Sequence, residues 1–121
     1  MSLIPVRLAV QQRVFPTYRA PFFEALGEAC PNGFSLFAGL PRTSEAIQSQ
    51  NSLQNGHFQQ GKNLHLFGGA AYLLWQRGLM PWLEEWQPET LIIEANPRYL
   101  SSTCAINWMH DHNRPVIGWG L

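Results

Sequence analysis

Two short segments of this 121-residue chain each place arginine and tyrosine beside a proline. The first covers residues 13–19 (RVFPTYR) and the second covers residues 94–99 (EANPRY). The guanidinium fork of arginine matches phosphate and carboxylate groups, and a tyrosine ring can stack on a sugar face. The two segments therefore predict a binding site for an anionic or hydroxyl-rich ligand. Its candidate residues are Arg13, Pro16, Thr17, Tyr18, Arg19, Glu94, Asn96, Arg98 and Tyr99.

A structural role competes with ligand binding at several of these positions. Arg98 could form an ion pair with Glu94 across the loop, since such pairs cluster at loop ends. Asn96, followed by proline, has the side chain that commonly caps a helix N-terminus. An arginine in the first helical turn opposes the helix dipole unless an anion or a carboxylate joins it. Arg19 is equally compatible with contacting a ligand and with ordinary surface exposure.

Alternating strands and helices must position the two segments. Apolar patterns predict strands at residues 7–12, 34–38, 64–67, 90–94 and 116–119. Helices are expected at about residues 20–30, 71–86 with a break at 78–81, and 97–112, with a weak helix after residue 43. This alternation predicts a single α/β domain over residues 1–121. Its core is a doubly wound, Rossmann-like parallel sheet of about five strands in the order 3-2-1-4-5, with helices on both faces. The ligand crevice of such a sheet lies between strands one and four, where both segments emerge.

Helical spacing also predicts which side chains face the core. The first helix is expected to bury Phe22, Phe23, Leu26 and Cys30. The last helix is expected to bury Leu100, Cys104 and Trp108.

Composition limits the classes of function. Charged residues make up 13% of the chain, against about 25% in a typical soluble domain, which suggests that another domain or subunit covers part of the surface. A net charge of zero argues against general nucleic-acid binding. The longest apolar stretch, near residues 66–75, is about half the ~20 residues that a membrane span needs. Two distant cysteines favour a cytoplasmic protein with reduced thiols.

Metal and cofactor signals are weak. His110 and His112 have the spacing i, i+2, which directs them to different sides of a helix. The glycine pairs near residues 68 and 118 lack the G-x-G-x-x-G pattern of dinucleotide sites. We therefore expect neither a bound metal nor a resident cofactor.

Three stretches of the sequence carry a resemblance. Residues 13–26, including the PFF of residues 21–23, resemble the opening of bacterial family-4 glycosyltransferases of the GT-B fold. Residues 86–100 (WQPETLIIEANPRYL) look like the fourth strand and following loop of the same subgroup, and residues 114–120 (RPVIGWG) are similar to its fifth strand. The resemblance spans nearly the whole chain except residues 41–63.

The resemblance implies an acceptor-side, N-terminal domain of a longer two-domain enzyme. Such an enzyme moves a sugar from a nucleotide-sugar to a polysaccharide or glycolipid acceptor, with retention of configuration and without a metal. It would work in the cytoplasm, or peripherally at the inner face of the membrane. The partner would be a C-terminal donor-binding domain, without which this chain is inactive. Many relatives have a glycine pair after strand one where this chain has Pro16 and Thr17, so a phosphate contact would fall to Arg19.

Two other classes of function stay open. One is a free-standing flavodoxin-like or receiver-like module that binds a small ligand or a protein. A receiver needs acidic residues at the ends of strands one and three, and the residues Gln11, Gln12 and Phe67 at those predicted ends argue against it. The other is a non-catalytic scaffold whose apolar face pairs with a partner chain or with a second copy.

Overall fold

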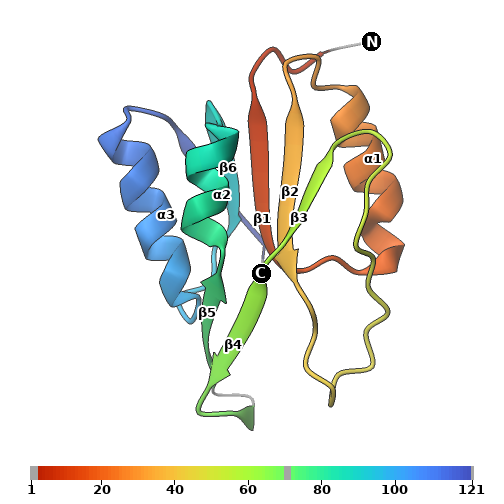
Figure 1. The fold of residues 1–121 in the computed structure, drawn as a ribbon, viewed down its shortest axis with the longest axis vertical. Coiled ribbons are helices and arrows are strands. Elements are labelled where there is room, and N and C mark those ends of the chain that lie inside the picture. The colour runs from red at the N-terminus through yellow and green to blue at the C-terminus, as the bar shows by residue number, and fades with distance from the viewer. Residues whose placement is uncertain (1–2, 70–71, 121) are drawn as a thin grey trace.

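A five-stranded parallel sheet forms the centre of the protein (Figure 1). The computed structural model describes residues 3–69 and 72–120. The strands lie in the order β3-β2-β1-β6-β7, which is 3-2-1-4-5 when only the strands of this sheet are counted along the chain. Their bounds are Leu8–Val14 (β1), Phe34–Gly39 (β2), His57–Gln60 (β3), Thr90–Glu94 (β6) and Val116–Trp119 (β7). The predicted α/β class with a Rossmann-like parallel sheet is confirmed.

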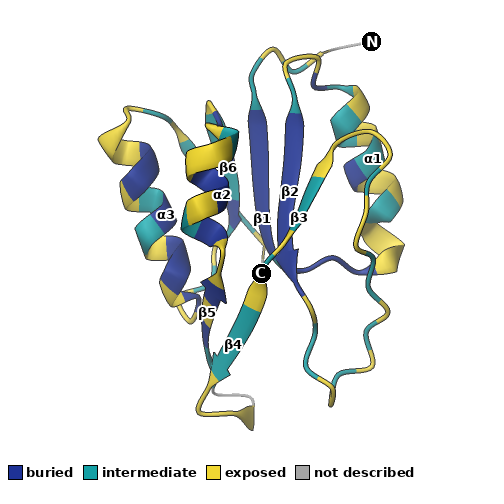
Figure 2. Cartoon of the chain, viewed as in Figure 1, coloured by how far each residue is buried: buried dark blue, intermediate teal, exposed yellow. Residues whose placement is uncertain are grey.

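Helices cover both faces of the sheet, as predicted. The helix α1 (Ala20–Glu28) packs on one face, and α2 (Leu79–Trp86) and α3 (Leu100–Asp111) pack on the other. Successive side chains of β1 alternate between two apolar clusters: Leu8 and Val10 face α1, whereas Ala9 faces α2 and α3. The central strands β1 and β2 are therefore buried along almost their whole length (Figure 2).

An antiparallel hairpin beside this sheet differs from the prediction. The strand expected at residues 64–67 exists as β4 (Lys62–Leu66), but it pairs with β5 (Leu73–Arg77) and not with the parallel sheet. The edge of the parallel sheet is β3 instead, which pairs with β2. The third sheet strand therefore comes from a segment earlier in the chain than expected.

The predicted helix over residues 71–86 is wrong in its first half; residue 71 itself lies outside the described residues. Along β5, Leu74 and Gln76 are buried while Trp75 and Arg77 are exposed, which is the period of two of a strand. Gly78 then adopts a φ of +95°, a conformation that favours glycine, and turns the chain into α2.

The weak helix expected after residue 43 does not form. Residues 43–56 instead bond to the segment that follows β1: Thr17 N–H donates to the Gln48 carbonyl at 2.8 Å, and Gln50 N–H donates to the Phe15 carbonyl at 2.9 Å. These bonds satisfy backbone groups that a helix would otherwise pair within itself. The polar middle of the chain thereby becomes part of the wall around the end of β1.

The last helix starts later than predicted, and it buries a different face. It begins at Leu100, because Asn96 Oδ1 accepts the Arg98 N–H at 2.9 Å and caps a preceding turn in place of the helix. Its buried residues are Ser101, Ser102, Ala105, Trp108 and Met109, whereas Leu100 is 39% exposed and Cys104 is only half-buried. In α1, Phe23 is fully buried as expected, but Phe22 is 49% exposed and stacks on Trp119 of β7.

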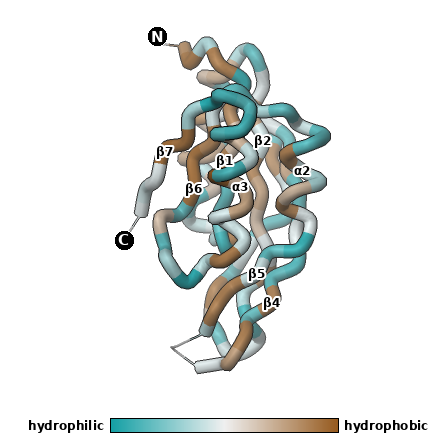
Figure 3. The backbone as a smooth tube through the Cα atoms, turned by 90° about the vertical axis from the view of Figure 1, so that its left-hand side faces the viewer, coloured by the Kyte–Doolittle hydropathy of each residue, from teal (hydrophilic) through white to brown (hydrophobic). Residues whose placement is uncertain are grey.

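Hydrophobic residues lie in β6 and at the start of the edge strand β7 (Figure 3). Of these, Ile117 on β7 is 51% exposed. Among the helices in the described residues, none has the length and the apolar character that crossing a bilayer demands.

Candidate functional site

A cavity of about 250 Å³ opens at the carboxyl ends of β1 and β6. We call it the switch-point cavity, because the order of the strands reverses there. It is lined by Gln12, Arg13, Val14, Pro16, Tyr18, Arg19, Ile47, Tyr72, Glu94 and Tyr99. Six of the nine predicted site residues lie in this lining. Two segments more than 70 residues apart in the chain thus meet as the predicted topology requires.

Glu94 is the central polar residue of the cavity. Its Oε1 accepts the backbone N–H of Arg13, and its Oε2 lies 3.5 Å from the hydroxyl of Tyr99. Burial raises the pKa of the Glu94 carboxyl, although the hydrogen bond from the Arg13 N–H and the positive charges of Arg13 and Arg19 oppose the shift. Burial and the nearby Glu94 carboxylate raise the pKa of the Tyr99 hydroxyl well above its usual value. Tyr99 therefore keeps its proton, and its hydroxyl donates a hydrogen bond to Glu94 Oε2.

The guanidinium of Arg13 forms an ion pair with a carboxylate of the protein itself. Its Nη1 and Nη2 donate to the two carboxylate oxygens of Glu45 at 2.9 and 2.8 Å, a bidentate pair. Glu45 Oε1 also accepts the backbone N–H of Arg42 at 2.8 Å. The hydrogen bond from Arg13 holds the pKa of Glu45 at about 2. Arg13 thus positions the cavity wall, and its charge is largely neutralised by Glu45.

Two aromatic side chains complete the wall beside Arg13. His65 Nε2 lies 3.3 Å from Arg13 Nη1, and the rings of His65 and Tyr72 meet edge to face with centroids 5.0 Å apart. Burial lowers the pKa of His65, and the positive charges of Arg13 and Arg42 lower it further. The neutral imidazole can then accept a hydrogen bond from Arg13.

Arg19 and Tyr18 form the mouth of the cavity. Arg19 is exposed, and its Nη1 donates to Gln12 Oε1 at 3.2 Å. Tyr18 is 76% exposed, and the Arg19 guanidinium lies 5.7 Å from the centre of its ring. A guanidinium has five N–H donors, so the side chain of Arg19 can reach an anionic group at the cavity mouth while it keeps its contact with Gln12.

A chain of buried amides supports the floor of the cavity. Gln11 Oε1 accepts the Glu94 N–H at 3.1 Å, and Gln11 Nε2 donates to Gln76 Oε1 at 2.6 Å. Gln76 Nε2 in turn donates to Asn63 Oδ1 at 2.9 Å and to the Gln12 carbonyl at 3.0 Å. The amides tie β1 and β6 to the β4–β5 hairpin. Because buried polar groups need partners, this network fixes the backbone that presents Glu94.

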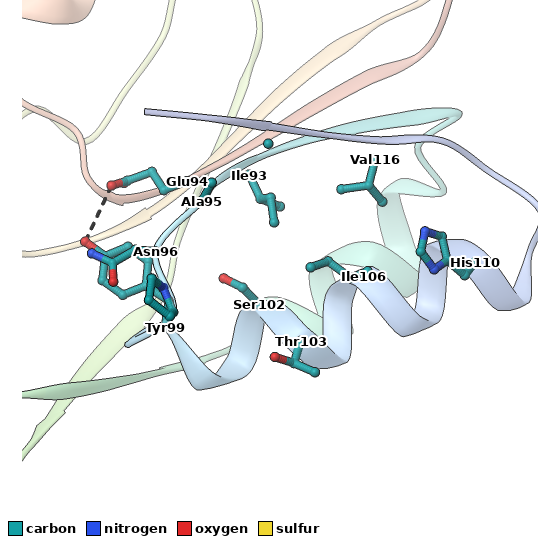
Figure 4. A pocket seen from close by; sticks show the side chains of 12 residues that line it. Ile93, Glu94, Ala95, Asn96, Tyr99, Ser102, Thr103, Ile106, His110 and Val116 are labelled. Atoms are coloured by element: carbon teal, nitrogen blue, oxygen red, sulfur yellow. Dashed lines mark hydrogen bonds between the residues drawn. The ribbon is translucent and has the colours of Figure 1, made fainter. Parts of the chain in front are cut away.

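A second cavity of about 440 Å³ lies on the other side of Glu94 and Tyr99, along α3 (Figure 4). We call it the α3 cavity. It is lined by Ile93, Glu94, Ala95, Asn96, Pro97, Tyr99, Ser102, Thr103, Ile106, His110, Val116 and Gly118. Asn96, a predicted site residue, therefore lies in this cavity and not in the switch-point cavity.

The remaining two predicted residues lie elsewhere. Thr17 lines a separate cavity of about 320 Å³ with Tyr18, Ala46, Ile47 and Gln48. Arg98 is exposed and belongs to neither the switch-point cavity nor the α3 cavity. The carbonyl of Arg98 accepts the Leu74 N–H at 2.8 Å, so its backbone ties the turn before α3 to the hairpin.

Sequence reasoning missed four residues that shape the switch-point cavity: Glu45, His65, Tyr72 and Gln76. All four lie in the polar middle of the chain or in the hairpin, where no periodic pattern points to the sheet. One signal was present in β1, where two glutamines end an apolar run (LAVQQ). Buried amides require partners, and those partners come from this region.

No family model, curated protein or solved structure matches this chain. Within residues 3–69 and 72–120, no three His, Cys, Asp or Glu side chains gather as a metal site.

Proposed function

We propose that this chain is the acceptor-side domain of a GT-B glycosyltransferase, and that its switch-point cavity binds a sugar-containing ligand. One observation carries the proposal. Arg19 and Tyr18, which follow β1, meet Glu94 and Tyr99, which follow or end β6, around one cavity at the carboxyl ends of the strands. The resemblance of residues 13–26 and 86–100 to family-4 glycosyltransferases supports the same assignment.

The cavity has the hydrogen-bonding groups that recognise a sugar. Sugar hydroxyls both donate and accept hydrogen bonds; Glu94 offers carboxylate oxygens, and Arg19 offers N–H donors. The exposed ring of Tyr18 can pack against the face of a pyranose ring. A volume of about 250 Å³ is smaller than the ~300–1,000 Å³ of sites for drug-sized ligands, which suits one sugar ring with a phosphate at the mouth.

In the proposed enzyme this domain holds the acceptor, and a C-terminal domain holds the nucleotide-sugar donor. The acceptor is a polysaccharide or a glycolipid, and a lipid-linked acceptor would bring the domain to the inner face of the membrane. Transfer needs the donor domain, so the 121-residue chain binds ligand without turnover. Incubation with UDP-glucose and a glycan acceptor should release no UDP; release of UDP above background would contradict this part of the proposal.

Ligand binding can be tested with glucose 1-phosphate and methyl α-glucoside in amide-resolved NMR titrations. We expect weak binding of both, with shifts in residues 13–19 and 94–99. Arg19→Ala should weaken glucose 1-phosphate about tenfold, or ~1.4 kcal/mol, and should weaken the uncharged glucoside less.

Arg77→Ala is the matched control, because Arg77 is exposed on β5 and lies outside the lining of the cavity. Its binding of both ligands should equal that of the unmodified chain. Absence of shifts in both segments with both ligands would overturn the proposal.

A further inference from the structure

The α3 cavity differs in chemistry from the switch-point cavity. Its centre is apolar: Ile93 of β6, Ile106 of α3 and Val116 of β7 face one another across it (Figure 4). Glu94 is the acidic residue in its lining, and neither lysine nor arginine is part of that lining. The switch-point cavity, in contrast, is lined by two arginines. The α3 cavity is therefore poorly suited to an anion.

A buried hydroxyl lies at the base of the α3 cavity. Ser102 is only 4% exposed, and its Oγ has no hydrogen-bond partner among the described residues. A helical serine commonly donates to the carbonyl four residues earlier, but here that carbonyl, of Arg98, accepts the Leu74 N–H. Figure 4 shows the Ser102 oxygen directed from α3 toward β6. A buried polar group without a partner costs free energy, which a ligand hydroxyl would recover.

The shape of the cavity indicates an elongated ligand. Glu94, Asn96 and Tyr99 form one polar end, and His110 lies at the other end (Figure 4). Ser102 and His110 are eight positions apart in the helix, a rise of about 12 Å. The volume of about 440 Å³ exceeds that of the switch-point cavity. A ligand along this axis would place its body on the apolar centre and its hydroxyls beside Ser102 and Asn96.

We propose that the α3 cavity is a second binding site, which takes an uncharged, hydroxyl-bearing ligand with an apolar body. A hydroxyl of the ligand bonds to Ser102 Oγ, and the apolar body packs on Ile93, Ile106 and Val116. This assignment rests on the contents of the cavity and does not require the chain to belong to a glycosyltransferase.

Octyl β-glucoside, kept below its micelle concentration, is a suitable probe in amide-resolved NMR titrations of the purified chain. We expect shifts at Ser102, Ile106, Val116 and Gly118, and at least tenfold tighter binding than methyl β-glucoside, which lacks the apolar chain. Octyl phosphate should also bind more weakly than octyl β-glucoside, because its charge has no cationic partner in the cavity. Amide shifts confined to Phe22 and Trp119, which lie outside the lining of the α3 cavity, would overturn the proposal.

Variants separate the site from general detergent binding. Ser102→Ala should weaken octyl β-glucoside about fivefold or more without loss of the fold. Gly118→Leu should abolish binding, because Gly118 and Val116 share the face of β7 that lines the cavity. A Cβ at Gly118 would lie 3.3 Å from the Cβ of Ala95, which also lines the cavity.

Ile117→Leu is the matched control, since Ile117 lies between these two residues and points to the opposite face of β7. Its affinity for octyl β-glucoside should be unchanged. If Gly118→Leu does not fold, the affinity of Ser102→Ala for octyl β-glucoside tests the proposal. Unchanged affinity in Ser102→Ala would overturn the proposal.

Discussion

The hydroxyl of Tyr99 and Oε2 of Glu94, 3.5 Å apart, form a wall shared by two cavities. Both residues line the switch-point cavity and the α3 cavity (Figure 4). A ligand that draws either side chain toward itself changes the wall of the other cavity. The two cavities therefore share a single side-chain pair, and burial raises the pKa of both the Glu94 carboxyl and the Tyr99 hydroxyl.

Glu94→Gln should flatten the dependence of stability on pH. The folded-state pKa of Glu94 is raised above its unfolded value near 4.5, so the folded chain binds this proton more tightly. Stability from this group is then present at low pH and is lost as pH rises through the unfolded value toward the folded pKa. Urea unfolding between about pH 5 and pH 8 would measure the effect, with the exposed Glu85→Gln as control. A decline in the free energy of unfolding equally steep in Glu94→Gln and in the unmodified chain would contradict the prediction.

Glu45→Gln should remove a contribution to stability that is lost at acidic pH, whereas the contribution from Glu94 is lost as pH rises. The pKa of Glu45 is lowered to about 2 by the hydrogen bond from Arg13. Stability from this carboxylate is present above its unfolded value near 4.5 and is lost as pH falls toward 2. We expect the variant to lose about 1.5 kcal/mol of unfolding free energy at neutral pH, since it removes the charge from a partly buried bidentate pair. Thermal unfolding from about pH 2 to pH 7 would check this, and an acid sensitivity equal to that of the unmodified chain would count against it.

Local sequence patterns predicted the two ends of the switch-point cavity well. Arginine, proline and tyrosine stand close together in residues 13–19 and again in 94–99, and the strand before each segment has a clear apolar pattern. Parallel topology then brings the two segments together without any further information. Glu45 and Tyr72 could not be predicted in the same way, because their contacts with Arg13 connect residues more than 30 positions apart across irregular chain.

Strand assignment failed where helical and strand patterns overlap. In residues 73–77 (LLWQR) every side chain is acceptable to a helix, and local propensity is overridden by the tertiary partners of the strand. Gln76 favours the strand, because in β5 its side chain forms hydrogen bonds with both Gln11 and Asn63. The parallel edge strand β3 was missed for a related reason, since its sequence HFQQ is polar and half-exposed.

Arg19 and Arg98 should differ in their effect on ligand binding. From the sequence alone, loss of glycan binding is expected for Arg98→Ala. The structure instead places Arg19 at the mouth of the switch-point cavity and Arg98 outside its lining. We expect Arg19→Ala to weaken glucose 1-phosphate about tenfold and Arg98→Ala to change its affinity less than twofold. Parallel NMR titrations would compare the two variants, and a larger loss in Arg98→Ala would move the anion contact to the β6–α3 turn.

Ser102→Ala should stabilise the ligand-free chain. The variant removes a buried hydroxyl that has no partner among the described residues and places a stronger helix former inside α3. We expect the free energy of unfolding to rise by about 1 kcal/mol. Chemical denaturation of the two proteins without ligand would measure it, with Ser101→Ala as the comparison. Ser101 Oγ accepts the Gln76 N–H at 3.0 Å, so that variant should be destabilised. Destabilisation of both variants would show that Ser102 Oγ has a partner in the folded chain.

Gln76→Leu should be the most destabilising of the proposed variants. The side chain of Gln76 is 2% exposed and bonds to the Gln11 side chain, the Asn63 side chain and the Gln12 carbonyl. Leucine fills a similar volume but leaves these polar groups buried without their partner, at a cost of about 2–3 kcal/mol. Gln60→Leu, on an exposed position of β3, should change stability by less than about 0.5 kcal/mol. Because Gln11 also holds the Glu94 N–H, Gln76→Leu should weaken glucose 1-phosphate even where the protein stays folded. Stability and affinity equal to those of Gln60→Leu would mean that the amide chain does not support the cavity.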